Sequence, residues 1–497
     1  MTGSGVPSSA LGLVQGDRRP PRWGLVAVLL VIAAAARVIG LGQDFWIDET
    51  ATAVTYLRLP WWKAVQTFQS ANQHLLYSVL GSLSFAAFGE SEVAARLPAV
   101  VFGVLGVGAL YFLGRQVAPE REAIAATLLL AVSYHHVWFS QSARGYTGMI
   151  FFATLGTTFF LRALAGNRGR DWAAYVACMT LGILCHLNTA FVVMGQAAAY
   201  PLAMSRWTEW RSSHRPITVR LISAVVAVAV LSLGGHALVL GQMIEFFRTV
   251  DRTGLGWTSV SSLAPVVGEG LRAGLGLAGM AMMAAVLVAG LARYARQGPL
   301  LAGLFVLPAA FNAVAIVALS YGAYPRSFLY VLPFALLLAV RGAAVAGDIV
   351  ARRLVPGERR AGVARTIEVG TVGLLVCASV WALTYDYRYP KQDYRGALRH
   401  VMAAKGPDDE VAAVGLAAVT YRYYYGTPSL RFPQTPDELR ALGAGGRRVW
   451  VLLTLPRDMR LRFPDLTRVI ETDFEPVARF RGTLGDGDLY VVASKRP

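Results

Sequence analysis

The chain has 497 residues, of which 55% are hydrophobic and 15% charged, and its mean hydropathy is +0.47. Soluble domains carry about 25% charged residues, so the composition excludes a single water-soluble globule, and an aromatic share of 11% with long apolar runs excludes a disordered chain. These runs reach the roughly 20 residues that a helix needs to cross a bilayer. We therefore expect an all-α polytopic membrane protein.

The formal net charge of +17 lies mainly in the apolar part of the chain. Residues 386–497 hold 18 Lys/Arg against 14 Asp/Glu, whereas the preceding residues hold 29 against 16, mostly in short loops between apolar runs. Basic loops that face the cytoplasm follow the positive-inside rule. The charge thus indicates membrane topology, and we expect a lipid bilayer and no nucleic acid as a partner.

The first apolar run, 23–42, follows a Gly/Ser/Pro-rich segment that ends in arginines. A cleaved signal peptide is the rival interpretation. Because the run is long and no small-residue cleavage site precedes the polar stretch at Gln43, we expect a retained first span and a cytoplasmic N-terminal tail over 1–22.

Ten further apolar runs make about eleven expected spans. They lie near 97–114, 123–139, 147–164, 172–188, 190–205, 219–240, 263–291, 300–320, 328–347 and 367–384. Alternation assigns the arginine-rich loops to the cytoplasm and leaves a long first outside loop, 43–96, within a transmembrane domain over 23–385. An odd number of spans places residues 386–497 outside the membrane.

Residues 386–497 are expected to form a small extracytoplasmic α/β domain. Helical spacing covers 393–404, and residues 410–415 and 449–454 have the apolar pattern of buried strands. Residues 477–494, around Gly485-Asp486-Gly487, are typical of a hairpin.

Two consecutive carboxylates, Asp48 and Glu49, begin the first outside loop. The ordinary interpretation is a solvated loop. However, Trp46 precedes the pair, and Trp61 and Trp62 follow in a segment that resembles an interfacial helix. Partial desolvation between aromatic side chains raises a carboxylate's pKa and makes it a better base. Asp48 is therefore the first candidate for a catalytic base, with Glu49 beside it.

Arg144 and Arg326 lie at outer membrane boundaries, against the positive-inside bias. Their planar guanidinium groups suit phosphate. His186 lies near the same surface, whereas Arg96 has the simpler interpretation of an arginine that snorkels to the interface. The polar residues therefore gather on one face of the membrane. Transporters usually bind near the midplane, so this distribution favours an enzyme of the outer leaflet.

At this point the chain resembles the GT-C superfamily of membrane glycosyltransferases, in the branch of family 39 with the protein O-mannosyltransferases and the aminoarabinose transferase. The resemblance extends over about residues 40–340, and its motifs are short but share their order, spacing and sidedness. They are Asp48-Glu49, His74 with Tyr77, the stretch from Phe88-Gly89-Glu90 to Arg96-Leu97-Pro98, Ser140 to Tyr146 around Arg144, His186, and Pro325-Arg326 to Leu332-Pro333.

The resemblance implies transfer of a hexose or pentose, with inversion, from a polyprenyl-phosphate donor to an envelope glycan, lipid or protein acceptor. Asp48, with Glu49, would act as general base, and Arg144, Arg326 and His186 would hold the donor phosphate. It further implies that His74, Tyr77 and Tyr146 bind substrate. We expect the site on the outer face of a plasma membrane.

Two departures from the family pattern matter. Leu75-Leu76 stands where relatives often have prolines, and Ser142 stands where many carry an acid. A divalent metal, Mg²⁺ or Mn²⁺, is therefore left open. The alternatives are a transporter or flippase of lipid-linked sugars, which would place charged residues at mid-span, and a non-catalytic scaffold, which has no use for Asp48 and Arg144 on one face.

Overall fold

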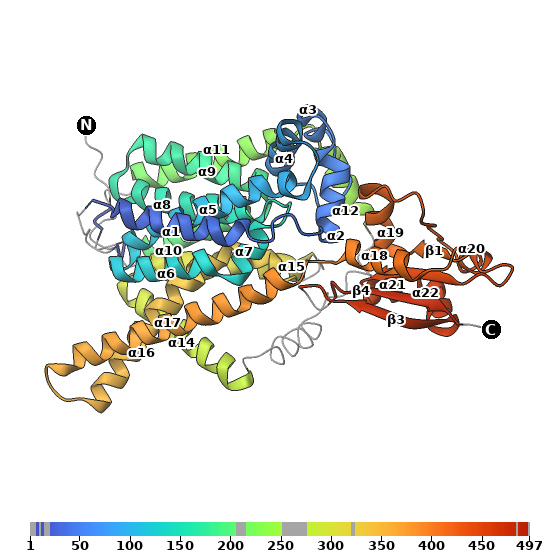
Figure 1. The fold of residues 1–497 in the computed structure, drawn as a ribbon. Helices are drawn as coiled ribbons and strands as arrows, with labels where there is room; N and C mark the ends of the chain where they lie inside the picture. Colours follow the sequence, from blue (N-terminus) through green and yellow to red (C-terminus); the bar gives the residue numbers. More distant parts are fainter. Residues whose placement is uncertain are drawn as a thin grey trace.

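The computed structural model describes residues 6–8, 11–13, 20–204, 215–250, 276–319, 324–483 and 486–495. Most of the expected tail, part of the span expected near 263–291 and the turn residue Gly485 lie outside the described residues. Figure 1 shows a bundle of long helices on the side of the N-terminus and a smaller α/β unit at the other end. We call the latter the C-terminal unit (389–483 and 486–495).

The bundle is built of long helices, most of which run roughly along one direction (Figure 1). They are α1 (Trp23–Val38), α5 (Glu92–Val117), α6 (Glu120–Val132), α8 (Tyr146–Gly166), α9 (Gly169–Cys185), α10 (Thr189–Met204), α11 (Arg215–His236), α14 (Gly276–Gln297), α15 (Pro299–Ala318), α16 (Leu332–Leu354) and α17 (Arg359–Arg388). Shorter segments lie at or near the end that meets the C-terminal unit. They are α2 (Ile47–Thr52), the π-helical η1 (Ala53–Leu57), α3 (Trp61–Ala64), α4 (Leu75–Phe88), α7 (Tyr134–Ser140), α12 (Leu240–Thr249) and the 3₁₀ segment η4 (Pro325–Val331).

The described helices include several that can cross a bilayer. Six are long and apolar enough, or seven if the bent pair α6–α7 counts as one span. Among the expected spans, those at 23–42 and 190–205 correspond to the shorter apolar helices α1 and α10. Within the described residues, helix length and hydropathy thus do not confirm the expected number of about eleven spans.

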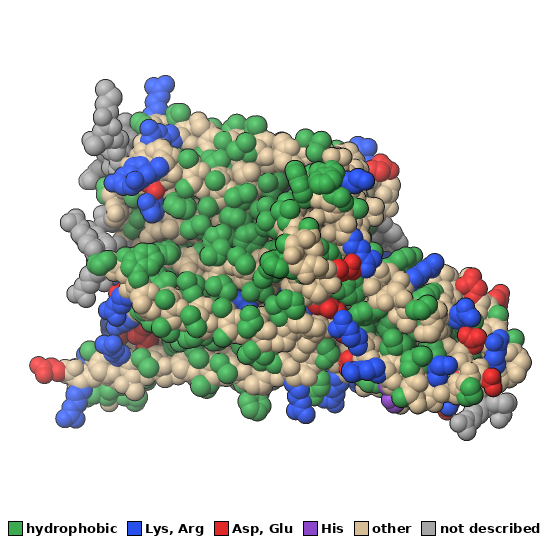
Figure 2. All heavy atoms as spheres, turned by 45° about the horizontal axis from the view of Figure 1, so that its top comes forward, with side chains coloured by type: hydrophobic (Ala, Val, Ile, Leu, Met, Phe, Trp, Pro, Cys, Tyr) green, Lys and Arg blue, Asp and Glu red, His purple; other side chains and the backbone are tan. Residues whose placement is uncertain are grey.

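The surface of the bundle is apolar. Figure 2 shows hydrophobic side chains over much of its visible face, whereas many charged side chains lie over its far end and the C-terminal unit. Large apolar side chains such as Val31, Leu374 and Trp381 are more than two-thirds exposed. Soluble monomers rarely expose large contiguous apolar patches. The apolar surface and the long apolar helices therefore indicate a multi-pass membrane protein.

The segment 43–96, expected as a long loop, is largely helical. Helix α4 is apolar but too short to cross a bilayer, and it packs along α5. Its polar side chains bond to the first turn of α5, where the Tyr77 hydroxyl donates to the Ala95 carbonyl and Ser84 donates to Ala94. These bonds fold the segment back onto the bundle, whereas Trp61 and Trp62 on α3 stay half exposed, as an interfacial segment requires.

A bend of 54° separates α6 from α7. The buried Arg37 of α1 holds this bend. Its guanidinium donates to the Ala131 carbonyl at 2.9 Å, at the end of α6, and its Nε donates to Ser140 Oγ at 3.0 Å, at the end of α7. The free carbonyls of a helix end need such donors when they are buried. As a result, α7 turns its aromatic face toward the C-terminal unit.

The C-terminal unit is an α/β fold with one four-stranded sheet of order β1-β2-β4-β3. β1 and β2 are parallel, and β4 is antiparallel to both β2 and β3. The predicted helix, the two buried strands and the hairpin pairing are all present. The elements are α18 (Tyr394–Ala404), β1 (Glu410–Ala413), α19 (Gly415–Val419), η5 (Thr420–Tyr424), α20 (Pro436–Leu442), β2 (Val449–Thr454), α21 (Pro456–Arg462), α22 (Pro464–Asp473), β3 (Phe474–Phe480) and β4 (Leu489–Ser494).

The C-terminal unit is fastened to the bundle by polar contacts near α2. Arg395 forms an ion pair with the buried Asp44 at 2.9 Å and a second one with Glu92 at the start of α5. Gln392 accepts a hydrogen bond from the Ile47 amide at 2.7 Å, at the first residue of α2. The start of α2 therefore lies between the bundle and the C-terminal unit.

Gly145 allows three segments to meet at this end of the bundle. A Cβ atom built on Gly145 would lie 2.0 Å from the Cys185 carbonyl oxygen, at the end of α9, and 3.1 Å from the Cβ of His74. Real Cβ atoms do not approach a backbone oxygen this closely. Glycine at this position therefore brings the segment that carries Arg144 against α9 and the start of α4.

We expect Gly145→Ala to lower the free energy of unfolding by about 1–3 kcal/mol, the usual cost of overpacking a close contact. The measurement is thermal unfolding in detergent. Gly169→Ala is the matched control, because a Cβ on Gly169 meets no atom within 4 Å. Equal melting temperatures for the two variants would contradict the assignment of Gly145 to a close backbone junction.

Candidate active site

Asp48 lies in the first turn of α2 and is held by two arginines. Its Oδ2 atom is 2.9 Å from Nη1 of Arg144 and 3.0 Å from Nη1 of Arg326. Arg144 comes from the segment between α7 and α8, and Arg326 from the start of η4. The structure thus brings together three residues that the sequence singled out separately.

The electrostatics of Asp48 differ from the expectation. Burial by itself raises the pKa of the Asp48 carboxyl, but the charges of Arg326 and Arg144 outweigh burial and hold the pKa below its usual value. The expected rise through desolvation is therefore wrong for this state of the site. Asp48 is an ionised carboxylate that carries the negative charge between two cations.

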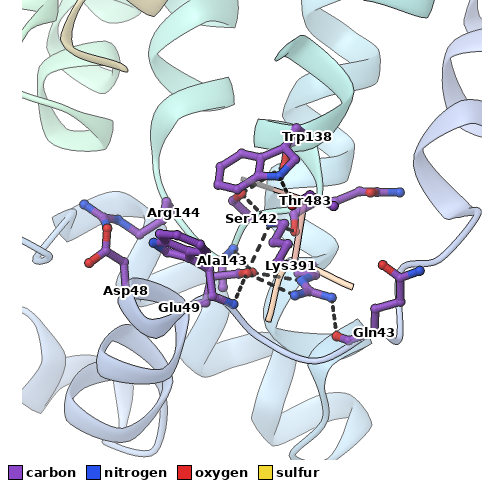
Figure 3. Close-up of polar contacts among 12 residues, drawn as sticks. Gln43, Asp48, Glu49, Trp138, Ser142, Ala143, Arg144, Lys391 and Thr483 are labelled. Carbon is purple, nitrogen blue, oxygen red and sulfur yellow. Dashed lines mark hydrogen bonds and ion pairs between the residues drawn. The ribbon is translucent and has the colours of Figure 1, made fainter. Parts of the chain in front are cut away.

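Glu49 has a different set of partners, although it adjoins Asp48 in sequence. Its Oε1 accepts from Arg96 Nε at 2.8 Å and from the Ala143 amide at 2.7 Å. Its Oε2 accepts from the Trp46 amide at 3.0 Å and from Lys391 Nζ at 3.1 Å. Figure 3 shows Glu49 between Ala143 and Lys391, with Asp48 and Arg144 beside them.

These partners keep Glu49 ionised although its side chain is only 1% exposed. Burial raises the pKa of Glu49, but the positive charges of Arg96 and Lys391 lower it to about 2. Both oxygens are saturated with donors. Glu49, predicted as a catalytic residue beside Asp48, therefore occupies a structural position in this state of the site.

Arg96 does not snorkel to the membrane interface, as the sequence suggested. Its side chain is 1% exposed, and besides Glu49 it donates to the carbonyls of Leu41 and Gln43 at 2.7 Å each. These carbonyls follow α1, just before Asp48. Arg96 therefore fixes the connection between α1 and α2. Its side chain is buried because α2 and α4 cover this part of α5.

Two histidines and a tyrosine lie behind Arg144. His74 accepts a hydrogen bond from Arg144 Nε at 3.0 Å. The rings of His74 and His186 lie 4.9 Å apart, and the Tyr146 ring is 5.0 Å from His186 and 5.3 Å from the Arg144 guanidinium carbon. Burial and the charge of Arg144 lower the pKa of His74 well below its usual value, so its ring is neutral and can accept this bond.

A cavity of about 360 Å³ opens beside Asp48. Among the predicted site residues, Asp48, Glu49, Arg144, Tyr146 and Arg326 line it. His74 and His186 are not among its lining residues, but His74 contacts Arg144 and His186 lies beside Tyr146. Tyr77 is buried in the α4–α5 contact instead, and the structure does not bring it to the cavity.

Most of the remaining cavity wall is aromatic and was not assigned from the sequence. These residues are Trp46, Tyr134, His135, Trp138, Phe139 and Tyr324. The positions of the four residues on α7 depend on the bend before it, and that of Tyr324 depends on η4; hydropathy predicts neither feature. Lys391 was missed as well, although the chain holds only four lysines and Lys391 lies a few residues after the last apolar run.

The donor set beside Asp48 does not fit a divalent cation. Among the described residues, no group of three His, Cys, Asp or Glu side chains lies close enough to hold a metal ion. Ser142 accepts a hydrogen bond from Lys391 at 2.6 Å. A metal ion at Asp48 would meet the positive charges of Arg144 and Arg326.

Comparisons with known proteins agree with this architecture. Residues 73–233 match the model of a protein family described as dolichyl-phosphate-mannose-protein mannosyltransferase. No curated protein matches the chain in sequence. The crystal structure of ArnT from Cupriavidus metallidurans bound to undecaprenyl phosphate is similar with a TM-score of 0.56 at 17% identity, over 95% of this chain and 97% of that chain. Its apo structure has a TM-score of 0.55 at 18% identity, with the same coverage.

At this level of identity the likeness to ArnT shows a shared fold. The family model and the fold together confirm the predicted resemblance to the GT-C superfamily of membrane glycosyltransferases. They do not favour the transporter or flippase alternative.

The pKa of Glu49 leads to a prediction on stability. The pKa of Glu49 in the folded protein is lowered from 4.5 to about 2. Its contribution to the free energy of unfolding is therefore present above pH 4.5 and is lost as the pH falls toward 2. The difference corresponds to about 3 kcal/mol. We expect Glu49→Gln to flatten the dependence of thermal unfolding on pH between pH 5 and 2, measured in detergent.

The matched control is Glu90→Gln, which removes a carboxylate from a more exposed ion pair with Arg58. Surface pairs of this kind contribute about 0–1 kcal/mol. A Glu49→Gln variant that retains the full acid sensitivity of the wild type would contradict the role of Glu49 as a buried charge.

Proposed function

We propose that the protein transfers a sugar from a polyprenyl-phosphate donor to an acceptor hydroxyl, with Asp48 as general base. The observation that carries the proposal is one carboxylate oxygen held within 3.0 Å of two arginines at the wall of a cavity. Such a cluster can bind a phosphate and can also accept a proton. The family match supports the reaction class.

Arg144 and Arg326 are suited to the donor phosphate. The side chain of Arg326 is 36% exposed and that of Asp48 24% exposed, so an anion can approach this pair. Guanidinium groups bind phosphate through paired N–H donors. They would also neutralise the negative charge that develops on the phosphate as the bond to the sugar breaks, which is where stabilisation lowers the barrier.

Donor binding would activate Asp48. In the free protein the two arginines lower the pKa of Asp48 and make it a weak base. A phosphate that pairs with Arg144 and Arg326 shares their charge, and its own negative charge raises the pKa of the nearby carboxylate. The base thus becomes stronger when the donor is in place.

The chemical step follows from these positions. The acceptor oxygen attacks C1 of the sugar as Asp48 removes the hydroxyl proton, and the bond between C1 and the phosphate oxygen breaks. The electron pair of that bond leaves with the polyprenyl phosphate, held by the arginines. A single displacement of this kind inverts C1. Glu49 takes no part in proton transfer in this proposal and positions Asp48 instead.

The cavity would hold the donor sugar. Its volume is within the range of small-molecule sites, and Trp46, Trp138 and Tyr324 offer flat apolar faces in its wall. We place this end of the bundle, together with the C-terminal unit, at the outer face of a plasma membrane, since the arginine-rich loops mark the opposite side as cytoplasmic. The acceptor is an envelope glycan, lipid or protein.

Asp48→Asn tests the base. Because a general base contributes about 10²–10⁴-fold, we expect kcat to fall by at least about 10²-fold while the melting temperature stays close to that of the wild type. The measurement is transfer of radiolabelled sugar from a panel of polyprenyl-phosphate donors by the purified protein. Asp348→Asn, an exposed position on α16, is the matched control. Equal transfer by wild type and Asp48→Asn would exclude Asp48 as the base.

Arg326→Gln tests the electrostatics of the base. Loss of this charge removes one of the two influences that lower the pKa of Asp48, so the pKa should rise. Because the base must be ionised, the acid limb of the kcat/KM profile should then move to higher pH, and the KM for the donor should increase. A limb that moves to lower pH, or does not move, would contradict the pairing of Arg326 with the catalytic carboxylate.

A further inference from the structure

Lys391 belongs to the C-terminal unit, but its side chain enters the end of the bundle. It follows α17 and precedes α18, and its side chain is 5% exposed. Its ammonium group donates to the Gln141 carbonyl at 2.6 Å, to Ser142 Oγ at 2.6 Å and to Glu49 Oε2 at 3.1 Å. It also lies 4.2 Å from the centre of the Trp138 ring. Figure 3 shows Lys391 beside Glu49 and Ser142.

The acceptors of Lys391 belong to the two segments that carry the reacting groups. Glu49 directly follows Asp48, and Gln141 and Ser142 lie just before Arg144. Glu49 in turn accepts from the Ala143 amide at 2.7 Å. One ammonium group therefore connects α2 to the segment 141–144, beside the Asp48–Arg144 pair (Figure 3).

The chemistry of a buried ammonium group explains why this connection is well defined. Lysine has three N–H donors and no acceptor, and here each donor has an oxygen acceptor. A buried charge is costly unless it is paired and hydrogen-bonded. The position of the Lys391 ammonium group is therefore well defined only when Glu49, Gln141 and Ser142 are all in place.

On the basis of the proposed function, we infer that Lys391 is a positioning residue. The C-terminal unit supplies it to fix the distance between the base Asp48 and the phosphate ligand Arg144, so that transfer requires this unit to be docked. This role differs from docking alone, which Arg395 serves through Asp44 and Glu92.

The titration of Lys391 supplies a readout that a purely structural contact would not move. Burial lowers the pKa of Lys391 to about 8, against the opposing negative charges of Glu49 on α2 and Asp386 on α17 and with the added positive charge of Arg96 on α5. The ammonium form is therefore lost as the pH rises through about 8. An alkaline limb of kcat near this pH should follow.

The experiment uses the full chain, purified in detergent, with four variants. Lys391→Met removes the charge and Lys391→Arg keeps it. Lys405→Met is the matched lysine control elsewhere in the C-terminal unit, and Arg395→Met removes the docking ion pairs without touching Glu49. Transfer from the polyprenyl-phosphate donors gives kcat, the donor KM and their pH profiles. Hydrogen–deuterium exchange gives the protection of the Trp46 and Ala143 amides, which bond to Glu49.

We expect Lys391→Met to lower kcat by about 10²-fold, the cost of a displacement of about 1 Å in a reacting geometry, with a smaller change in donor KM. The Trp46 and Ala143 amides should exchange about tenfold faster or more. Lys391→Arg should retain part of the activity and move the alkaline limb to higher pH, because arginine stays charged. Lys405→Met should match the wild type.

Wild-type kcat and wild-type amide protection in Lys391→Met would overturn the inference. A loss of kcat in Lys391→Met with wild-type protection of the Trp46 and Ala143 amides would also overturn it, because the loss would then not come from the order of the two segments. If the wild type transfers sugar from none of the donors, the proposed function fails, and the amide protection in Lys391→Met still decides whether Lys391 orders the two segments.

Discussion

The rest of the site depends on the hydrogen bonds and ion pairs of one buried carboxylate, that of Glu49. It accepts hydrogen bonds from Trp46, Arg96, Ala143 and Lys391, which come from the start of α2, from α5, from the segment before α8 and from the C-terminal unit. A charge with so little access to water must be compensated locally. Four parts of the chain are therefore held around one residue, and Asp48 and Arg144 gain their positions from it.

This arrangement separates two tasks that adjacent carboxylates could have shared. Glu49 is saturated by donors and holds the structure together, whereas Asp48 stays accessible and shares its charge with Arg144 and Arg326. In the absence of substrate, the Asp48 carboxylate is the anion that lies between the guanidinium groups of Arg144 and Arg326. The proposed donor would replace it there, so that binding of the phosphate and activation of the base become one event.

Several features were predictable because they depend on local sequence. Long apolar runs predicted the membrane bundle, although not the exact number of spans. A continuous apolar run predicted β2 at Val449–Thr454, and the turn residues around Asp486 predicted the pairing of β3 with β4. The sequence also singled out Asp48, because tryptophans precede and follow it, and Arg144 and Arg326, because arginines at an expected outer boundary run against the positive-inside bias. In each case the signal lies in one short stretch of residues.

The partners of those residues were decided only by the tertiary structure. Asp48 and Glu49 look alike in sequence, but successive helix residues point about 100° apart, so Asp48 meets Arg144 and Arg326 whereas Glu49 meets Arg96 and Lys391. Lys391 reaches Glu49 across 342 positions of the chain, and no local pattern records that contact. Composition and periodicity thus determined that this is a membrane protein with acidic and basic groups at one end of a bundle. Long-range packing decided which carboxylate is buried and which is accessible, because burial and charge pairing arise only when distant segments meet.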